Sequence, residues 1–170
     1  MISNVDVGDN MRLFLKRDVS MGESAFVVFD GSGREKYRAE VGKTKVGGKF
    51  NIVISDAQGG VAARIRELPI VGTKTFVFKV DRSHVTFVIL PTPGGLSYRF
   101  YGSNWYIGGD LATKNFDIID VDKSVILRHV RHSDYCELDI ARESAELYCV
   151  AASVCANLIN TTEKLAPLAV

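Results

Sequence analysis

The sequence has no excess of charge of either sign. It contains 21 lysine and arginine residues against 20 aspartate and glutamate residues, which gives a formal net charge of +1 at pH 7. A charge this close to zero supplies no long-range attraction to nucleic acid or to an anionic membrane. We therefore expect no nucleic-acid partner, and any binding to an anionic surface must come from a local group of cations.

Cysteine is also scarce, and no apolar segment marks the start of the chain. Three cysteines, Cys136, Cys149 and Cys155, are an odd number for a disulfide framework, so buried thiols are expected. The beginning of the chain lacks the apolar core of 7–15 residues that a secretory signal peptide needs. A cytoplasmic location is therefore expected, with peripheral attachment to a membrane if the protein binds lipid.

The sequence contains none of the complete motifs that accompany common catalytic chemistries. A phosphate-binding loop requires Gly-x-x-x-x-Gly-Lys-Ser/Thr, and although Gly42, Lys43 and Thr44 match its end, Tyr37 occupies the position of the first glycine. Neither a dinucleotide fingerprint inside a βαβ unit nor a Gly-x-Ser-x-Gly turn occurs. We expect a protein that is not an enzyme and that needs no cofactor.

The best candidate metal ligands are His129, His132, Asp134 and Cys136, which lie close together in the sequence. Imidazole, carboxylate and thiolate are the groups that bind zinc. In an extended strand, however, residues three apart face opposite sides, so these side chains cannot converge without a bulge. We expect no metal site, and a small metal-dependent hydrolase built on this segment is the alternative to a binding protein.

By contrast, one long apolar segment lies near the end of the chain, between Glu143 and Asn160. At 100° per residue its side chains leave no polar face wide enough to meet water, which predicts a helix buried on every side. Interrupted by Ser153 and Asn157, the apolar run is shorter than the roughly 20 residues that cross a bilayer. We predict that this segment is a core helix, not a transmembrane one, followed by a short tail over 161–170.

Before this helix, the chain repeats a unit in which an apolar strand ends in aspartate, a short turn follows and a second strand departs. The unit occurs around Asp30, Asp56, Asp81 and Asp120. Aspartate at the first position of a type I turn accepts hydrogen bonds from the turn, and glycine at the fourth accepts the left-handed backbone that follows. The pattern predicts antiparallel hairpins in which these carboxylates are structural.

Alternation of apolar and polar residues places one face of each strand against a core. Ile65, for example, lies between Arg64 and Arg66. Such segments indicate about twelve strands over residues 11–140. Side chains alone can just fill the interior of an eight-stranded barrel. A barrel of twelve strands is wider, and we expect the helix to occupy the additional space. We predict one domain over residues 1–170, all-β with one helix: a closed antiparallel barrel of about twelve strands around a buried C-terminal helix.

Three segments, in their order along the chain, resemble those of one family. They are Trp105-Tyr-Ile-Gly-Gly109-Asp110, Asn115-Phe-Asp-Ile-Ile119-Asp120, and Tyr135-Cys-Glu-Leu-Asp139-Ile140 leading into the apolar helix. With the Asp-x-x-Gly turns, they make residues 11–160 similar to the LURP-one-related proteins of the tubby C-terminal-like superfamily. The resemblance implies the same barrel. The resemblance implies less about function. Tubby proteins bind phosphoinositides, but no segment of this sequence matches their phosphoinositide-binding motif.

Two pairs of basic residues are the candidate ligand-binding residues. Lys36 with Arg38, and Arg64 with Arg66, each place two cations on one strand face about 7 Å apart. That spacing suits two phosphate oxygens or neighbouring anionic headgroups. Exposed basic residues are also ordinary devices for protecting sheet edges. We predict a non-enzymatic binding module whose partner is an anionic phospholipid headgroup or, alternatively, another protein.

Overall fold

The described part of the chain forms a twelve-stranded antiparallel sheet and one α-helix. The computed structural model describes residues 10–20 and 25–159. The strands are β1 (Met11–Asp18), β2 (Ala25–Phe29), β3 (Glu35–Lys43), β4 (Phe50–Asp56), β5 (Val61–Leu68), β6 (Lys74–Val80), β7 (Ser83–Thr92), β8 (Gly95–Tyr101), β9 (Tyr106–Asp110), β10 (Asn115–Ile119), β11 (Val125–Arg131) and β12 (Cys136–Ile140). A 3-10 turn, η1 (Glu143–Ala145), leads into α1 (Glu146–Leu158). The predicted fold class is confirmed.

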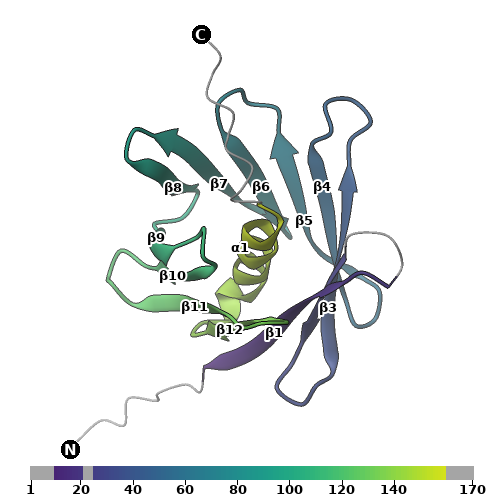
Figure 1. The fold of residues 1–170 in the computed structure, drawn as a ribbon. Helices are drawn as coiled ribbons and strands as arrows, with labels where there is room; N and C mark the ends of the chain where they lie inside the picture. The colour runs from purple at the N-terminus through teal and green to yellow at the C-terminus, as the bar shows by residue number, and fades with distance from the viewer. Residues whose placement is uncertain (1–9, 21–24, 160–170) are drawn as a thin grey trace, which may run out of the picture.

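The strands form a barrel that is nearly closed (Figure 1). Neighbouring strands follow the order β8-β7-β6-β5-β4-β3-β2-β1-β12-β11-β10-β9, so the first strand of the chain pairs with the last. The two edges of this sheet are β8 and β9, which are not hydrogen-bonded to each other. A seam therefore remains between them, where the sequence predicts complete closure.

Aromatic side chains meet next to the seam. The ring of Trp105, just before β9, meets Phe100 of β8 edge-on at 6.1 Å and Tyr148 of the helix at 5.8 Å. The chain leaves β8 through Gly102, whose φ is 87° and where an added Cβ would lie 2.7 Å from the carbonyl oxygen of His84. This tight turn carries the chain away from β8 before β9 begins, so the two strands do not pair.

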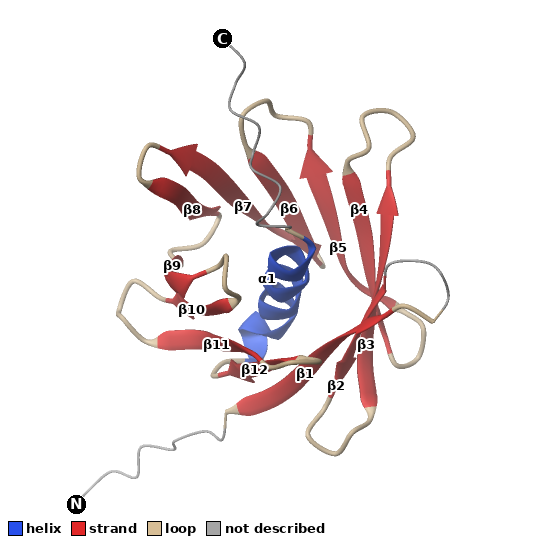
Figure 2. Cartoon of the chain, viewed as in Figure 1, coloured by secondary structure: helices blue, strands red, loops and turns tan. Residues whose placement is uncertain are grey.

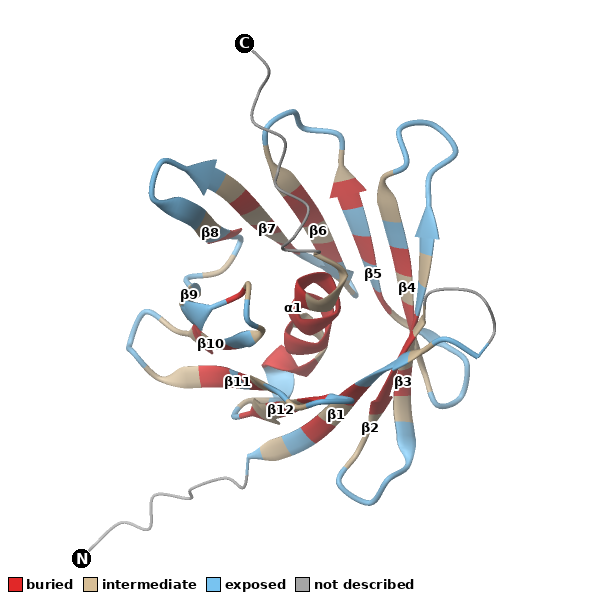
Figure 3. Cartoon of the chain, viewed as in Figure 1, coloured by how far each residue is buried: buried red, intermediate tan, exposed pale blue. Residues whose placement is uncertain are grey.

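Burial alternates along the strands, as the sequence pattern predicts (Figure 3). On β5, Ala63 and Ile65 are buried, whereas Arg64 and Arg66 are exposed. The inward side chains of neighbouring strands meet in one core around the helix. The barrel therefore has an apolar lining and a polar outer surface.

The helix α1 fills the barrel, as predicted (Figure 2). Every residue from Cys149 to Ala156 is at most 1 % exposed.

The structure corrects the start of the predicted helix, because residues 143–145 form a 3-10 turn and α1 begins at Glu146. Asn160 and the predicted tail over 161–170 lie outside the described residues. None of the helices in the described part of the chain has the length and apolar character needed to cross a bilayer.

Three of the four predicted aspartate turns share one geometry. The backbone N–H of Gly33 donates to the carbonyl of Asp30, and the N–H of Asp30 donates to the carbonyl of Arg34. Asp56 and Asp120 begin turns with the equivalent two hydrogen bonds. These positions cap hairpins, which confirms their structural role.

The fourth turn, at Asp81, differs from the prediction. Val80 pairs directly with Ser83, so only two residues separate β6 from β7. Asp81 itself has a φ of 52°. Two-residue hairpins require left-handed backbone in the turn, and aspartate tolerates it better than most residues. Asp81 is thus part of the turn rather than its cap.

Replacing Ala151 with arginine tests whether the helix is enclosed. The substitution buries an unpaired charge and overfills a site with no exposed surface, at a cost of several kcal/mol against the ~5–15 kcal/mol stability of a typical domain. We expect Ala151→Arg to be unfolded or insoluble. The control is Val71→Arg, at a position that is 85 % exposed, which should fold normally. A soluble Ala151→Arg protein with an unchanged melting temperature would contradict the enclosed helix.

The capping role of Asp56 can be tested by its replacement with alanine. Its Oδ1 accepts hydrogen bonds from the backbone N–H groups of Gln58 and Gly60, at 3.0 and 2.9 Å. Loss of both bonds should lower the free energy of unfolding by about 1 kcal/mol, by analogy with helix caps. Urea denaturation measures the change. Asp56→Asn keeps the acceptor and should lose less, and equal losses in the two variants would argue against capping.

Candidate functional site

Arg64 and Arg66 lie on the outer face of β5, and both are exposed, as the sequence predicts. Among the residues that the structure describes, no carboxylate forms an ion pair with either guanidinium. On β4, the residues opposite them are Val53 and Asn51, which carry no charge. Both guanidinium groups are therefore available to an external anion.

A third cation extends this pair. Lys79 on β6 is exposed and lies directly opposite Arg64. Like charges directly opposite each other on neighbouring strands destabilise a sheet. An anion that binds between them would remove this repulsion. We call Arg64, Arg66 and Lys79 the basic face.

A β-bulge turns Lys36 away from the surface on which it was expected. Successive residues at the end of β2 lie opposite Tyr37 and then Glu35, so Lys36 is the extra residue of β3. Its ammonium group forms an ion pair with Glu146 at the start of the helix, and the Tyr37 hydroxyl donates to the same carboxylate at 3.0 Å. Burial and the Glu146 charge raise the pKa of Tyr37. Lys36 thus anchors the helix and does not form an outward pair with Arg38.

Arg38 is half-buried on the outer side of β3, where carboxylates already surround it. Its guanidinium donates to Asp18 and to Glu35, each at 3.0 Å. The hydrogen bond to Asp18 is the main cause that raises the pKa of Arg38. Hydrogen bonds from Ser20, and then from Arg38, lower the pKa of Asp18 to about 2. A ligand would have to displace these carboxylates, so the basic face is the stronger of the two predicted sites.

The four potential metal ligands do not converge on one point. His129 faces the core and is 1 % exposed. His132 lies at the surface, where its Nε2 is 3.1 Å from Glu137. No three histidine, cysteine, aspartate or glutamate residues are placed to hold a metal ion together within residues 10–20 and 25–159. The geometry gives the alternative of a metal-dependent hydrolase no support in this segment.

Cys136, Asn157 and His129 are hydrogen-bonded in a row, but they are not arranged for nucleophilic catalysis. The Cys136 thiol donates to Asn157 Oδ1 at 3.5 Å, and Asn157 Nδ2 donates to His129 Nε2 at 3.3 Å. His129 Nδ1 donates to the carbonyl of Lys114 at 2.7 Å. Burial raises the pKa of the Cys136 thiol and lowers the pKa of His129 to about 4. No hydrogen bond joins the imidazole to the sulfur, and burial disfavours the reactive thiolate.

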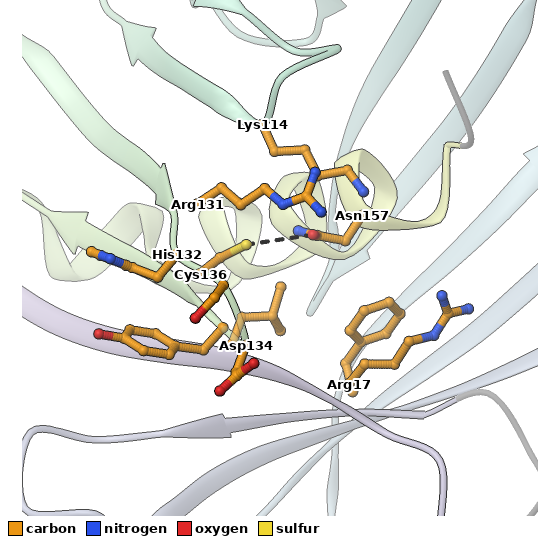
Figure 4. A pocket seen from close by; sticks show the side chains of 11 residues that line it. Arg17, Lys114, Arg131, His132, Asp134, Cys136 and Asn157 are labelled. Carbon is orange, nitrogen blue, oxygen red and sulfur yellow. Dashed lines mark hydrogen bonds between the residues drawn. The ribbon is translucent and has the colours of Figure 1, made fainter. Parts of the chain in front are cut away.

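Next to this row of side chains lies a pocket of about 270 Å³ that the sequence analysis missed (Figure 4). Arg17, Lys114 and Arg131 line it, together with Cys136 and Asn157. We call it the end pocket, because it lies at the end of the barrel where the helix ends. Its three cations come from β1, the β9–β10 turn and β11. Residues so far apart in sequence leave no local pattern that would reveal the pocket.

Comparison with known proteins extends the evidence for the fold. No protein-family model and no curated protein matches the chain. Among the solved structures similar to it is the X-ray structure of a protein from Arabidopsis thaliana, with a TM-score of 0.55 and 12 % sequence identity. The match covers 86 % of this chain and 89 % of the plant protein. At this identity the likeness shows a shared fold and does not assign a function.

The buried imidazole of His129 predicts a pH dependence of stability. Its pKa is about 4 in the folded protein against 6.5 for an ordinary histidine, so the unfolded chain binds a proton that the folded protein excludes. Stability should therefore fall as the pH decreases from about 6.5 to about 4, by roughly 3 kcal/mol in all. Urea denaturation of the wild type and of His129→Gln across this range measures the effect.

The control for this experiment is His84→Gln, because His84 is exposed. We expect His129→Gln to have a flatter pH profile than the wild type, and His84→Gln to follow the wild type. Parallel profiles for the wild type and His129→Gln would show that His129 is not buried as a neutral imidazole.

Proposed function

We propose that this protein is a non-enzymatic binding module of the LURP-one-related type, and that it binds anionic phospholipid headgroups through the basic face. The observation that carries the proposal is that Arg64, Arg66 and Lys79 are exposed together without a carboxylate partner among the described residues. The tubby-like barrel fits a binding module, since its interior is filled by the helix and leaves function to the surface. We further propose that residues 1–170 act as one domain.

The chemistry of the basic face suits phosphate oxygens. A guanidinium group presents a planar fork of donors that matches two oxygens of a phosphate. Arg64 and Arg66 project from the same side of β5, so their guanidinium groups can engage one headgroup or two neighbouring ones. Lys79 adds a compact charge next to Arg64. Three cations on a small patch supply the local attraction that the net charge of the chain does not.

The location that follows from this proposal is the cytoplasmic surface of a membrane. Anionic lipids are concentrated in the cytoplasmic leaflet, and a cation near that surface contributes about 1 kcal/mol of attraction. Three cations alone bind weakly and reversibly. The module would therefore be peripheral to the membrane.

A protein partner is the second candidate, and the seam between β8 and β9 favours it. Both edges carry backbone groups that no other strand in the described part of the chain pairs. Such edges accept an added strand from a peptide. The exposed side chains of Tyr101 and Tyr106 flank the seam and would contact such a peptide. This mode uses no residue of the basic face.

Vesicle binding tests the basic face. Arg64→Glu combined with Arg66→Glu should reduce binding to vesicles that contain phosphoinositide or cardiolipin by more than tenfold, while the melting temperature changes little because the altered charges are exposed. Binding of the wild type should also weaken between low and physiological salt. Co-sedimentation with vesicles measures both effects.

The matched control reverses the same number of charges elsewhere on the barrel. Arg12→Glu combined with Arg128→Glu alters two residues that are 61 % and 60 % exposed on β1 and β11. This variant should retain most of the binding. A wild type that ignores every anionic vesicle at low salt would exclude the lipid proposal and leave the protein partner as the favoured function.

A further inference from the structure

We propose that the end pocket is a second, separate binding site, which takes one phosphate-type oxyanion such as inorganic phosphate or the phosphate of a small monoester. The site does not rest on the proposed role of the basic face, because the two share no residue. It is built by Arg17, Lys114 and Arg131 around the end of the helix (Figure 4).

The pocket gathers more positive than negative charge. Arg17, Lys114 and Arg131 line it with a single carboxylate, Asp134. In the described part of the chain, none of the three cations forms an ion pair with a carboxylate. Elsewhere on this protein, cations such as Arg38 have carboxylate partners. A doubly charged phosphate would balance the excess.

The cations are close enough to repel one another. Burial lowers the pKa of Lys114, and the charges of Arg131 and Arg17 lower it further. In Figure 4, the side chains of Lys114 and Arg131 extend toward the same side of the pocket, near Asn157. Repulsion among these cations costs free energy, and an anion bound between them would replace that repulsion with attraction.

Contacts around the pocket hold the segments that carry the cations. The backbone N–H of Arg131 donates to Asn115 Oδ1 at 2.9 Å, and the guanidinium of Arg17 lies 5.6 Å from the centre of the Phe26 ring. The carbonyl of Lys114 accepts the hydrogen bond from the buried His129. Lys114 has a φ of 65°, a left-handed conformation that residues other than glycine adopt infrequently. The site is therefore largely formed before a ligand arrives.

The size of the pocket limits the ligand. Its volume of about 270 Å³ is just below the range of roughly 300–1,000 Å³ that holds drug-sized molecules. A phosphate with a few further atoms fits this volume. The shared chemistry is thus a phosphate group, which could belong to a free solute or to the headgroup of a lipid.

A titration with inorganic phosphate tests the site. Isothermal titration calorimetry of the wild type at low salt should show saturable binding at one site per chain. Arg17→Gln combined with Arg131→Gln removes two cations whose side chains are exposed, so this variant should fold, and its affinity for phosphate should fall at least tenfold. The single variant Lys114→Gln should show a smaller loss.

Two controls separate this site from the basic face and from a nonspecific effect of charge. Arg12→Gln combined with Arg128→Gln removes two cations elsewhere, and Arg64→Gln combined with Arg66→Gln alters the basic face alone. Both variants should bind phosphate as the wild type does. The proposal is wrong if the wild type shows no saturable phosphate binding, or if the end-pocket variants bind phosphate as tightly as the wild type.

Vesicles of phosphatidylcholine with phosphatidic acid distinguish the two sources of phosphate. If the ligand is a lipid headgroup, inorganic phosphate should compete with vesicle binding, and the Arg17→Gln, Arg131→Gln variant should lose it. If the ligand is a free solute, that variant should lose phosphate binding and keep its vesicle binding. Loss of vesicle binding only in the Arg64→Gln, Arg66→Gln variant would assign the lipid to the basic face and would support a free phosphate solute as the ligand of the end pocket.

Discussion

The need to keep one apolar helix away from water determines the shape of this protein. The helix α1 has no face that could meet solvent, and its middle turns are completely enclosed. The width of the barrel follows from the side chains. Alanines such as Ala151, Ala152 and Ala156 keep the helix thin, which leaves room in the same core for large side chains such as Phe76 and Phe87 of the strands. Neither part is stable alone, since the helix without the barrel exposes its apolar surface and the barrel without the helix encloses a void.

Because apolar contacts are non-directional, they do not by themselves decide how the helix is rotated inside the barrel. Polar contacts at the two ends of the helix fix its rotation. At the first turn, the buried Glu146 is bonded to Lys36 and Tyr37 of β3. At the last turn, Asn157 is bonded to Cys136 of β12 and to His129 of β11. These polar contacts fix the two ends of the helix to different strands of the barrel, and the second set also places Asn157 at the edge of the end pocket.

The sequence predicts whatever depends on local spacing and misses what depends on a single inserted residue or on distant segments. The helix, the strands and the aspartate turns have periods that can be seen within about twenty residues. The bulge at Lys36 could not be foreseen, because one extra residue reverses the direction of a side chain without altering the apparent alternation. The seam depends on how two distant strands meet after Gly102. Arg64 and Arg66 lie on the predicted face because β5 alternates regularly from Ala63 onward, past the bulge at Ala62.

The pairing of the first strand with the last has a consequence for how the protein is made. Leu13 of β1 lies opposite Leu138 of β12, and the helix that fills the barrel follows β12 in the chain. On the ribosome, the apolar faces of the strands are therefore synthesised before the segment that will cover them. Contacts between such distant residues also make folding slow. Until the helix has been made, the nascent chain exposes these apolar faces, which favours aggregation of the incomplete barrel.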